Sequence, residues 1–488
     1  MKNDVNVWIS RIGLGIIFCY CLLASIFFSY FAQLHLTLCY LPFPVFVGEI
    51  VICFCLPLLV WVNQEKPSFS HRTLLLIGLY FGWVLIKAFI NYHFDGPLTC
   101  RNAALFYYPV YAVFAYSFYQ KAMMPREVLI ALAFLAGGIL FFKVMNVWYW
   151  WSYVTIFVIA IRNVRSYQWR WVGWVFLAVI FGLGKEYLYQ GHRGHFVSIF
   201  GVVLFLGIYV GCLFAKRHDY VRLSIVLVSF IIFTLGYRVF SEHNTVISVI
   251  SLTGMVDTYN KYDKYYKESL GNFTPEKLTV HLYNPKKLKT LFLPPPVTSV
   301  SPVPTAPSTA SSQILPDLLE NIQRNRMWAG RSLDLDENNI VFRLFVWRDM
   351  IHELIAQRAW WGFSFGHPQR SKSLETLHWG ESEWGRDGWI TPHNSFLHII
   401  YRAGILGLFF IAILFYMVGK LIKDFLRLDS MEGGFLVSAL IYWMVLSNFF
   451  IILEFPYNAI IFWTTFGITC AYRDDLRRQE PWRQRPKE

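Results

Sequence analysis

Charged residues are scarce in this sequence: they make up only 15% of its 488 residues, whereas hydrophobic residues make up 56%. An ordinary soluble domain has about 25% charged residues. The scarcity of charge, together with a mean hydropathy of +0.41, excludes an ordinary soluble globular protein. It predicts a polytopic membrane protein, in which apolar runs of roughly 20 residues cross the bilayer as helices.

The large segment 241–390 lacks cysteine, and the sequence lacks the common metal-binding motifs. None of the eight cysteines lies between residues 241 and 390, and all eight fall in or beside apolar runs. This placement suggests neither a set of disulfides nor a zinc site. The sequence also has no HExxH, P-loop or CxxC motif. We therefore expect no metal ion and no other cofactor.

Long apolar runs, in contrast, are abundant. They predict an all-α polytopic membrane protein with about 12 transmembrane helices and one large loop outside the cytoplasm. The predicted spans cover residues 12–31, 40–62, 73–92, 102–119, 128–145, 147–161, 172–189, 195–215, 223–240, 395–418, 434–453 and 457–472.

The distribution of Lys and Arg predicts the orientation of these spans. Alternate short loops hold most of the basic residues, whereas the other set contains almost only Arg101 and Arg193. Because cytoplasmic loops are rich in Lys and Arg, the basic set should be cytoplasmic, and so should both termini. The net charge of +13 is then largely a matter of topology, and a nucleic-acid partner is not implied.

Four regions follow from this pattern. Residues 1–240 hold spans one to nine, 241–392 form the large outer loop, 393–472 hold spans ten to twelve, and 473–488 form a basic cytoplasmic tail. Inside the loop, residues 294–312 are a Pro, Ser and Thr stretch that predicts a flexible tether. Residues 338–361 have helical periodicity and predict an amphipathic helix along the membrane surface, which ends near Gly362.

Two arginines at the outer ends of predicted elements need an explanation. Arg193 lies between Gly191 and Gly194, and Arg343 lies on the predicted surface helix. Such side chains can simply extend to lipid head groups. Flanking glycines, however, allow a bulky anion to approach the backbone and the guanidinium together. A diphosphate is such an anion.

His393 and Asn394 open the predicted tenth span. The positive end of a helix keeps an imidazole neutral, which is the state that a general base requires. His393 is therefore a candidate base, although an isolated His at a span boundary is often only an interfacial residue. Asn394 could orient the base or the substrate, or it could cap the helix.

At this point three short motifs resemble the O-antigen ligase and O-antigen polymerase superfamily. "PHNSFLHIIYRAGILGLFF" resembles the family's HN-x-x-L…G-x-x-G signature, and the matching residues are His393, Asn394, Leu397, Gly404 and Gly407. "NIVFRLFVWRDMIHELIAQRAWWGFSFG" is similar to the preceding R-x-x-x-W segment and glycine pair, matched by Arg343, Trp347, Gly362 and Gly366. Arg193 in "GHRGHF" resembles the family's upstream Arg, with His192 in place of the usual Ser.

The resemblance implies periplasmic glycan transfer in a bacterial inner membrane, from an undecaprenyl-diphosphate-linked donor to a saccharide hydroxyl. His393 would be the base, and the Arg193 and Arg343 side chains would bind the diphosphate without a metal, aided by Arg101. Trp347 could stack on a sugar ring, although aromatic residues also gather at membrane interfaces. The acceptor would be lipid A core in a ligase, or a second lipid-linked glycan in a polymerase.

A polytopic transporter or flippase is the alternative from another class. Transporters have broken helices with ionisable groups near the middle of the bilayer. Lys87, Lys143 and Glu49 lie within predicted spans and keep this alternative open. Membrane lipids are expected neighbours of the chain in either case.

Overall fold

The computed structural model shows a mostly helical chain. Structural statements below concern the residues that it describes, and side chains at several of these positions, including 193–197 and 334–342, are not described. The described residues are 2–32, 34–36, 45–64, 67–96, 98–122, 154–155, 158–159, 161, 193–226, 228, 334–373 and 392–483.

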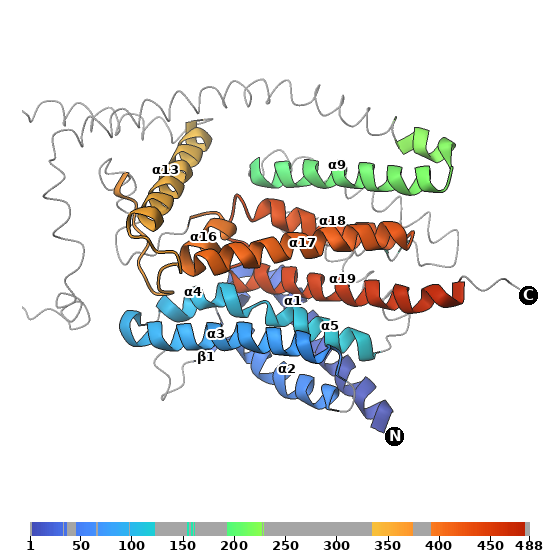
Figure 1. The fold of residues 1–488 in the computed structure, drawn as a ribbon, viewed down its shortest axis with the longest axis horizontal. Helices are drawn as coiled ribbons and strands as arrows, with labels where there is room; N and C mark the ends of the chain where they lie inside the picture. Colours follow the sequence, from blue (N-terminus) through green and yellow to red (C-terminus); the bar gives the residue numbers. More distant parts are fainter. Residues whose placement is uncertain are drawn as a thin grey trace, which may run out of the picture. The chain divides into compact units, whose positions relative to one another are not determined.

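Eleven helices and one short ribbon make up the principal elements of this described part (Figure 1). The ribbon pairs β1 (His35–Leu36) antiparallel with β2 (Val45–Phe46). The predicted all-α class is thus confirmed apart from these few residues. The helices are α1 (Lys2–Ala32), α2 (Val47–Asn63), α3 (His71–Asp95), α4 (Leu98–Tyr107), α5 (Val110–Ala122), α9 (Arg193–Lys216), α13 (Asp334–Ala356), α16 (Ser395–Ala403), α17 (Ile405–Arg427), α18 (Met431–Leu446) and α19 (Pro456–Arg483).

Four helical segments in the described part are long and apolar enough to cross a membrane. They are Asp4–Phe27, His71–Asp95, Ser198–Lys216 and Ile405–Arg427. On α3 the apolar side chains of Leu75, Leu85 and Phe89 are 64%, 67% and 81% exposed. Rows of large exposed apolar side chains are typical of a surface that faces lipid.

Two predicted spans are interrupted, so their predicted continuity was wrong. The run 102–119 is divided between α4 and α5 by a turn at Tyr108 and Pro109, and proline lacks the N–H that a helix interior needs. The run 395–418 is divided between α16 and α17 at Gly404, whose φ is 56°. The spanning helix there begins at Ile405.

Two other predicted spans are shorter than expected, and four lie wholly or mostly outside the described residues. Helix α2 has 17 residues because its chain is a strand up to Phe46, and α18 has 16 residues because it ends at Leu446. The runs 128–145 and 172–189 lie outside the described residues, as do most of 147–161 and 223–240.

The chain divides into two compact units. The first comprises Met1–Gly236, Ile351–Gln369 and Asp387–Glu488, and the second comprises Tyr237–Met350 and Arg370–Arg386. In the second unit, Asp349 at the end of this part of α13 accepts hydrogen bonds from the Ser371 hydroxyl at 2.6 Å and the Ser373 amide at 2.9 Å. These bonds tie the segment after Gln369 to α13.

The core of the first unit is formed by helices from both ends of the chain. Helix α19 packs against α5, α1 and α18, and α9 packs against α18. Figure 1 shows α17, α18 and α19 side by side. Their interior contains fully buried aromatic side chains, including Trp443, Tyr442 and Phe118. This packing holds the residues just before α17 and α19 in fixed positions.

The predicted surface helix 338–361 corresponds to α13, which ends at Ala356. The helix therefore ends five residues earlier than predicted; residues 357–361 form a turn, and Gly362 after it has a φ of 73°. The apolar side chains of this helix divide into a buried set and an exposed set. Phe345 and Met350 are buried, but Ile351 and Ile355, which are one turn apart, share an exposed face.

Candidate functional site

The start of α16 is fixed by Asn394. Its backbone is extended, with φ −153° and ψ 104°, and its side-chain oxygen accepts a hydrogen bond from the Leu397 amide at 3.0 Å. This contact satisfies one of the free N–H groups of the first helical turn. Of the two predicted roles, the structure therefore gives Asn394 the capping role.

His393, the predicted base, has an unusual backbone. Its φ is 49°, a left-handed conformation that costs a non-glycine residue about 1 kcal/mol or more. The other described non-glycine residues with positive φ are His218, Arg358 and Asp429, and each lies two residues after the last residue of a helix. His393 instead precedes a helix cap. Its half-buried side chain is thus held at a strained position beside the N-terminus of α16.

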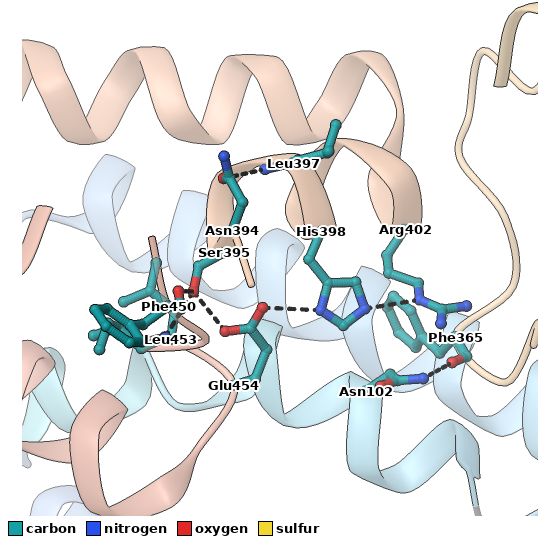
Figure 2. A network of polar contacts seen from close by, with 11 residues as sticks. Asn102, Phe365, Asn394, Ser395, Leu397, His398, Arg402, Phe450, Leu453 and Glu454 are labelled. Carbon is teal, nitrogen blue, oxygen red and sulfur yellow. Dashed lines mark hydrogen bonds and ion pairs between the residues drawn. The ribbon is translucent and has the colours of Figure 1, made fainter. Parts of the chain in front are cut away.

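A buried polar chain begins at the first residue of α16 (Figure 2). The Ser395 hydroxyl donates to Glu454 Oε2 at 2.5 Å and accepts from the Ile452 and Leu453 amides at 2.9 and 3.1 Å. Glu454 Oε1 lies 2.9 Å from Nδ1 of His398. The loop before α19 is thereby tied to the first two turns of α16.

Arg402 fixes the proton position on His398. Its Nε donates to His398 Nε2 at 3.1 Å, and Arg402 can only donate. Nε2 must therefore be the unprotonated nitrogen, and Nδ1 carries the proton that is donated to Glu454. His398 is consequently a neutral imidazole with both nitrogens engaged, which leaves it unsuited to act as a base in this arrangement.

The rest of Arg402 binds backbone. Its Nη1 donates to the carbonyls of Ser364 and His367, both at 2.7 Å, and the side chain is 2% exposed. Lys87 of α3 donates to the Arg402 carbonyl at 2.6 Å. The buried Arg402 and the half-buried Lys87 therefore hold the 361–367 segment and the end of α16 together.

The glycines of the two motifs meet at the same junction. Phe363 N donates to Tyr401 O at 2.8 Å, and Ile405 N donates to Trp360 O at 2.9 Å. A Cβ added to Gly404 would collide with the Trp360 carbonyl, and one added to Gly362 would collide with the backbone of Arg402 and Ala403. Both glycines also have positive φ. Only glycine permits this close backbone contact.

Arg101, a predicted diphosphate ligand, lies on α4 near the buried chain. Its half-buried guanidinium is within electrostatic range of Glu454 and of His398. Burial lowers the pKa of Arg101, and the Glu454 carboxylate opposes this shift. An arginine remains protonated at neutral pH, so Arg101 supplies a positive charge beside the start of α16.

The other predicted ligands are distributed over different elements. Arg343 and Trp347 are half-buried side chains of α13 within the second unit. Arg193 is the first residue of α9, and its side chain lies outside the described part of the chain. Among the predicted site residues, His393, Asn394 and Arg101 belong to the first unit, and Arg101 lies within electrostatic range of His398, one turn into α16.

His398, Arg402 and Glu454 were missed from sequence. Their signal was present: His398 and Arg402 stand one helical turn apart in a run that otherwise reads as apolar, where ionisable residues are costly. Treating 395–418 as one lipid-crossing helix concealed it. Glu454 carries no local signal, because its partners lie more than 50 residues earlier.

Two further sources give no assignment. Among the described residues, no three His, Cys, Asp or Glu side chains gather in a way that could hold a metal ion. Comparisons with protein-family models, curated proteins and solved structures found no match to this chain. The geometry around α16 and the sequence motifs remain as the indications of function.

Proposed function

We propose that this protein transfers a glycan from an undecaprenyl-diphosphate-linked donor to a saccharide hydroxyl on the periplasmic side of a bacterial inner membrane. The observation that carries the proposal is the HN-x-x-L…G-x-x-G run from His393 to Gly407. The motif residues His393, Asn394 and Gly404 each have a distinct local role at the start or end of α16. A run that resembles a family signature thus coincides with a strained and densely bonded backbone, a combination that is common at functional sites.

In the proposed reaction, His393 accepts the proton of the acceptor hydroxyl. The hydroxyl oxygen attacks the anomeric carbon of the donor sugar, and the bond from that carbon to the diphosphate oxygen breaks. Undecaprenyl diphosphate leaves with the electron pair of that bond. Its charge needs stabilisation more than protonation, and Arg101 and Arg193 of the first unit would contribute to it. For Arg343 this role is what the family resemblance implies.

The proposed topology has about 12 spans, with both termini cytoplasmic and the loop 241–392 periplasmic. The break at Gly404 moves the tenth span to Ile405–Arg427. It leaves α16, with only nine residues, outside the spanning helix. His393 would then lie at the outer membrane interface, where a lipid-linked diphosphate and a periplasmic acceptor can meet.

Ligation to lipid A core is the favoured form of the reaction. Polymerisation on a second lipid-linked glycan is the alternative within the same chemistry. The two forms differ in the acceptor, and hence in the product that carries the new glycosidic bond.

Transport is the second candidate, and one observation favours it. The α16–α17 break has buried ionisable groups beside it, as transporters do. Against transport, the candidate charges have structural partners: Lys87 donates to the carbonyls of Arg402 and Trp361, and Glu49 accepts from Tyr107 and Tyr108. Lys143 lies outside the described residues.

Transfer by the purified protein in lipid tests the proposal. The reaction contains an undecaprenyl-diphosphate-linked glycan, lipid A core and excess chelator. The key variant is His393→Asn, because asparagine adopts a left-handed φ readily and should preserve the fold while removing the base. His218→Asn is the matched control, since His218 also has positive φ but is exposed at the end of α9.

We expect glycan on the core with the wild type and with His218→Asn, and none with His393→Asn. Lengthened carrier-linked glycan without core product would assign the polymerase reaction. Absence of transfer to either acceptor by folded wild-type protein would refute glycan transfer and direct the next assay to transport. Activity of His393→Asn at the wild-type rate would refute the base assignment alone.

A further inference from the structure

Five buried polar atoms near the end of α3 have no hydrogen-bond partner. They are Nδ2 of Asn91, Oδ2 of Asp95, Oγ1 of Thr99, and both Oε1 and Nε2 of Gln369. Thr99 is fully buried and Gln369 is 1% exposed. The great majority of buried polar side-chain atoms in proteins are hydrogen-bonded, so this concentration needs an explanation.

Asp95 and Thr99 lie against Gly366, and Asn91 and Gln369 are connected to this point through α3 and through the chain after Gly366. A Cβ added to Gly366 would collide with the Asp95 side chain and lie 2.6 Å from Thr99 Oγ1. Asn91 and Asp95 are one helical turn apart on α3 and share a face. Gln369 follows Gly366 by three residues, which limits their Cα separation to about 10 Å. Two parts of the chain, residues 91–99 and 366–369, thus bring unpartnered groups into one region.

A neighbouring polar side chain, that of Asn102, does have a hydrogen-bond partner in this region. Asn102 Nδ2 donates to the Phe365 carbonyl at 2.6 Å (Figure 2). The Phe365 ring is stacked on Phe106, with centroids 5.0 Å apart, and Trp83 packs edge-on against both rings. The 365–366 segment is therefore firmly placed, and the nearby unpartnered atoms are not the result of a loose loop.

The chemistry of the group indicates its ligand. It contains an amide nitrogen, a complete amide, a hydroxyl and one carboxylate oxygen, so it can both donate and accept. An anion is disfavoured by Asp95. A cation is disfavoured because Asp95 already lies within electrostatic range of Arg402. A polyhydroxylated neutral ligand matches the set, because each hydroxyl both donates and accepts.

We propose that Asn91, Asp95, Thr99 and Gln369 bind the hydroxyl groups of a saccharide. The assignment of that saccharide as the donor or the acceptor sugar rests on the proposed glycan transfer. The binding of saccharide hydroxyls itself rests on the arrangement of the four side chains.

The test uses the double variant Thr99→Val, Gln369→Met, in which both substitutions keep the approximate side-chain shape and remove the polar atoms. Because these atoms have no protein partner, the variant should keep the wild-type melting temperature. Asn102→Leu is the matched control: it breaks the bond to Phe365 and should lower the melting temperature.

Binding is measured in nanodiscs with three probes: undecaprenyl diphosphate, the same lipid bearing N-acetylglucosamine, and deacylated lipid A core oligosaccharide. We expect one of two results with the wild type. Either it binds the N-acetylglucosamine lipid more tightly than bare undecaprenyl diphosphate, or it shows measurable binding of the core oligosaccharide. The double variant should lose about tenfold in that affinity and retain affinity for bare undecaprenyl diphosphate.

The outcomes separate the inference from the proposed function. A loss confined to the N-acetylglucosamine lipid assigns the donor sugar, and a loss confined to the core oligosaccharide assigns the acceptor. Equal saccharide affinities in the wild type and the folded double variant would overturn the inference, as would a wild type that binds neither saccharide. Saccharide binding that depends on these residues, without transfer to any acceptor, would support the inference and count against the glycosyltransferase proposal.

Discussion

The two ends of α17 use charged side chains in different ways. Near its C-terminal end, Asp424 pairs with Arg477 at 2.5 Å and with Arg473 at 3.7 Å, and Arg473 also pairs with Asp474 at 2.8 Å. About 30 Å away along the helix axis, Arg402 and Lys87 donate mostly to backbone carbonyls instead. One end pairs side chains with each other, and the other end uses them to hold backbone in place.

Because of this difference, we expect the C-terminal end of α17 to tolerate the loss of a charged side chain better than the α16 end. A partly exposed ion pair contributes little to stability, and water can replace a lost partner. A buried guanidinium that satisfies three acceptors cannot be replaced in that way. The constrained end also contains the strained His393 and the unpartnered polar atoms near Gly366. Of the two ends, we expect the α16 end to be the one at which stability and the proposed ligand binding compete.

Removal of Arg402 should have the largest effect. Arg402→Met leaves His398 Nε2 and the Ser364 and His367 carbonyls buried without their donor, and we expect a loss of about 3–5 kcal/mol in the free energy of unfolding. Arg477→Met, whose arginine is 43% exposed, should cost about 1 kcal/mol or less. Denaturation in detergent measures both, and equal losses would remove the contrast between the two ends.

The second prediction concerns the helix break. Gly404→Ala introduces a Cβ against the Trp360 carbonyl at a φ of 56°, so it should destabilise the protein by about 2 kcal/mol or more. Gly419→Ala, at a position in α17 where an added Cβ meets no other atom, should be neutral or stabilising by up to about 1 kcal/mol. A Gly404→Ala protein as stable as the wild type would mean that the close packing at the junction is dispensable.

The smallest expected effect is the loss of the α16 cap. Asn394→Ala removes the acceptor for the Leu397 amide and should cost about 1 kcal/mol, whereas Asn394→Asp should restore most of it. Glycan transfer, measured alongside stability, sharpens the assignment. Activity that follows the cap, lost in the Ala variant and restored in the Asp variant, fits a capping role; activity lost in both folded variants would add an orienting role for the amide.

Several elements could be predicted because their signals are local. A continuous apolar run predicted α3 and α9 nearly to their ends, and the polar pair His393 and Asn394 predicted a helix start. Gly362 predicted a turn, and its φ of 73° confirms it. Each of these signals is contained within one segment of chain.

The errors have the opposite origin. Hydropathy could not reveal the break at Gly404, because it depends on the approach of the 360–362 backbone. The partnership of Glu454 with His398 depends on the packing of α19 against α18 and on the loop between them. The group around Gly366 joins α3, α4 and residues some 270 positions later in the chain. No local pattern encodes such contacts.

The bond from Lys87 to the Arg402 carbonyl has a consequence for biosynthesis. The two residues are 315 positions apart in the sequence, and Glu454 follows its partner His398 by 56 positions. Since chains are made from the N-terminus and non-local contacts form late, α3 is synthesised long before its partner exists. Ribosomes stalled before residue 454 would carry a long chain in which His398 still lacks Glu454. Completion of the buried polar chain therefore depends on the segment that follows α18.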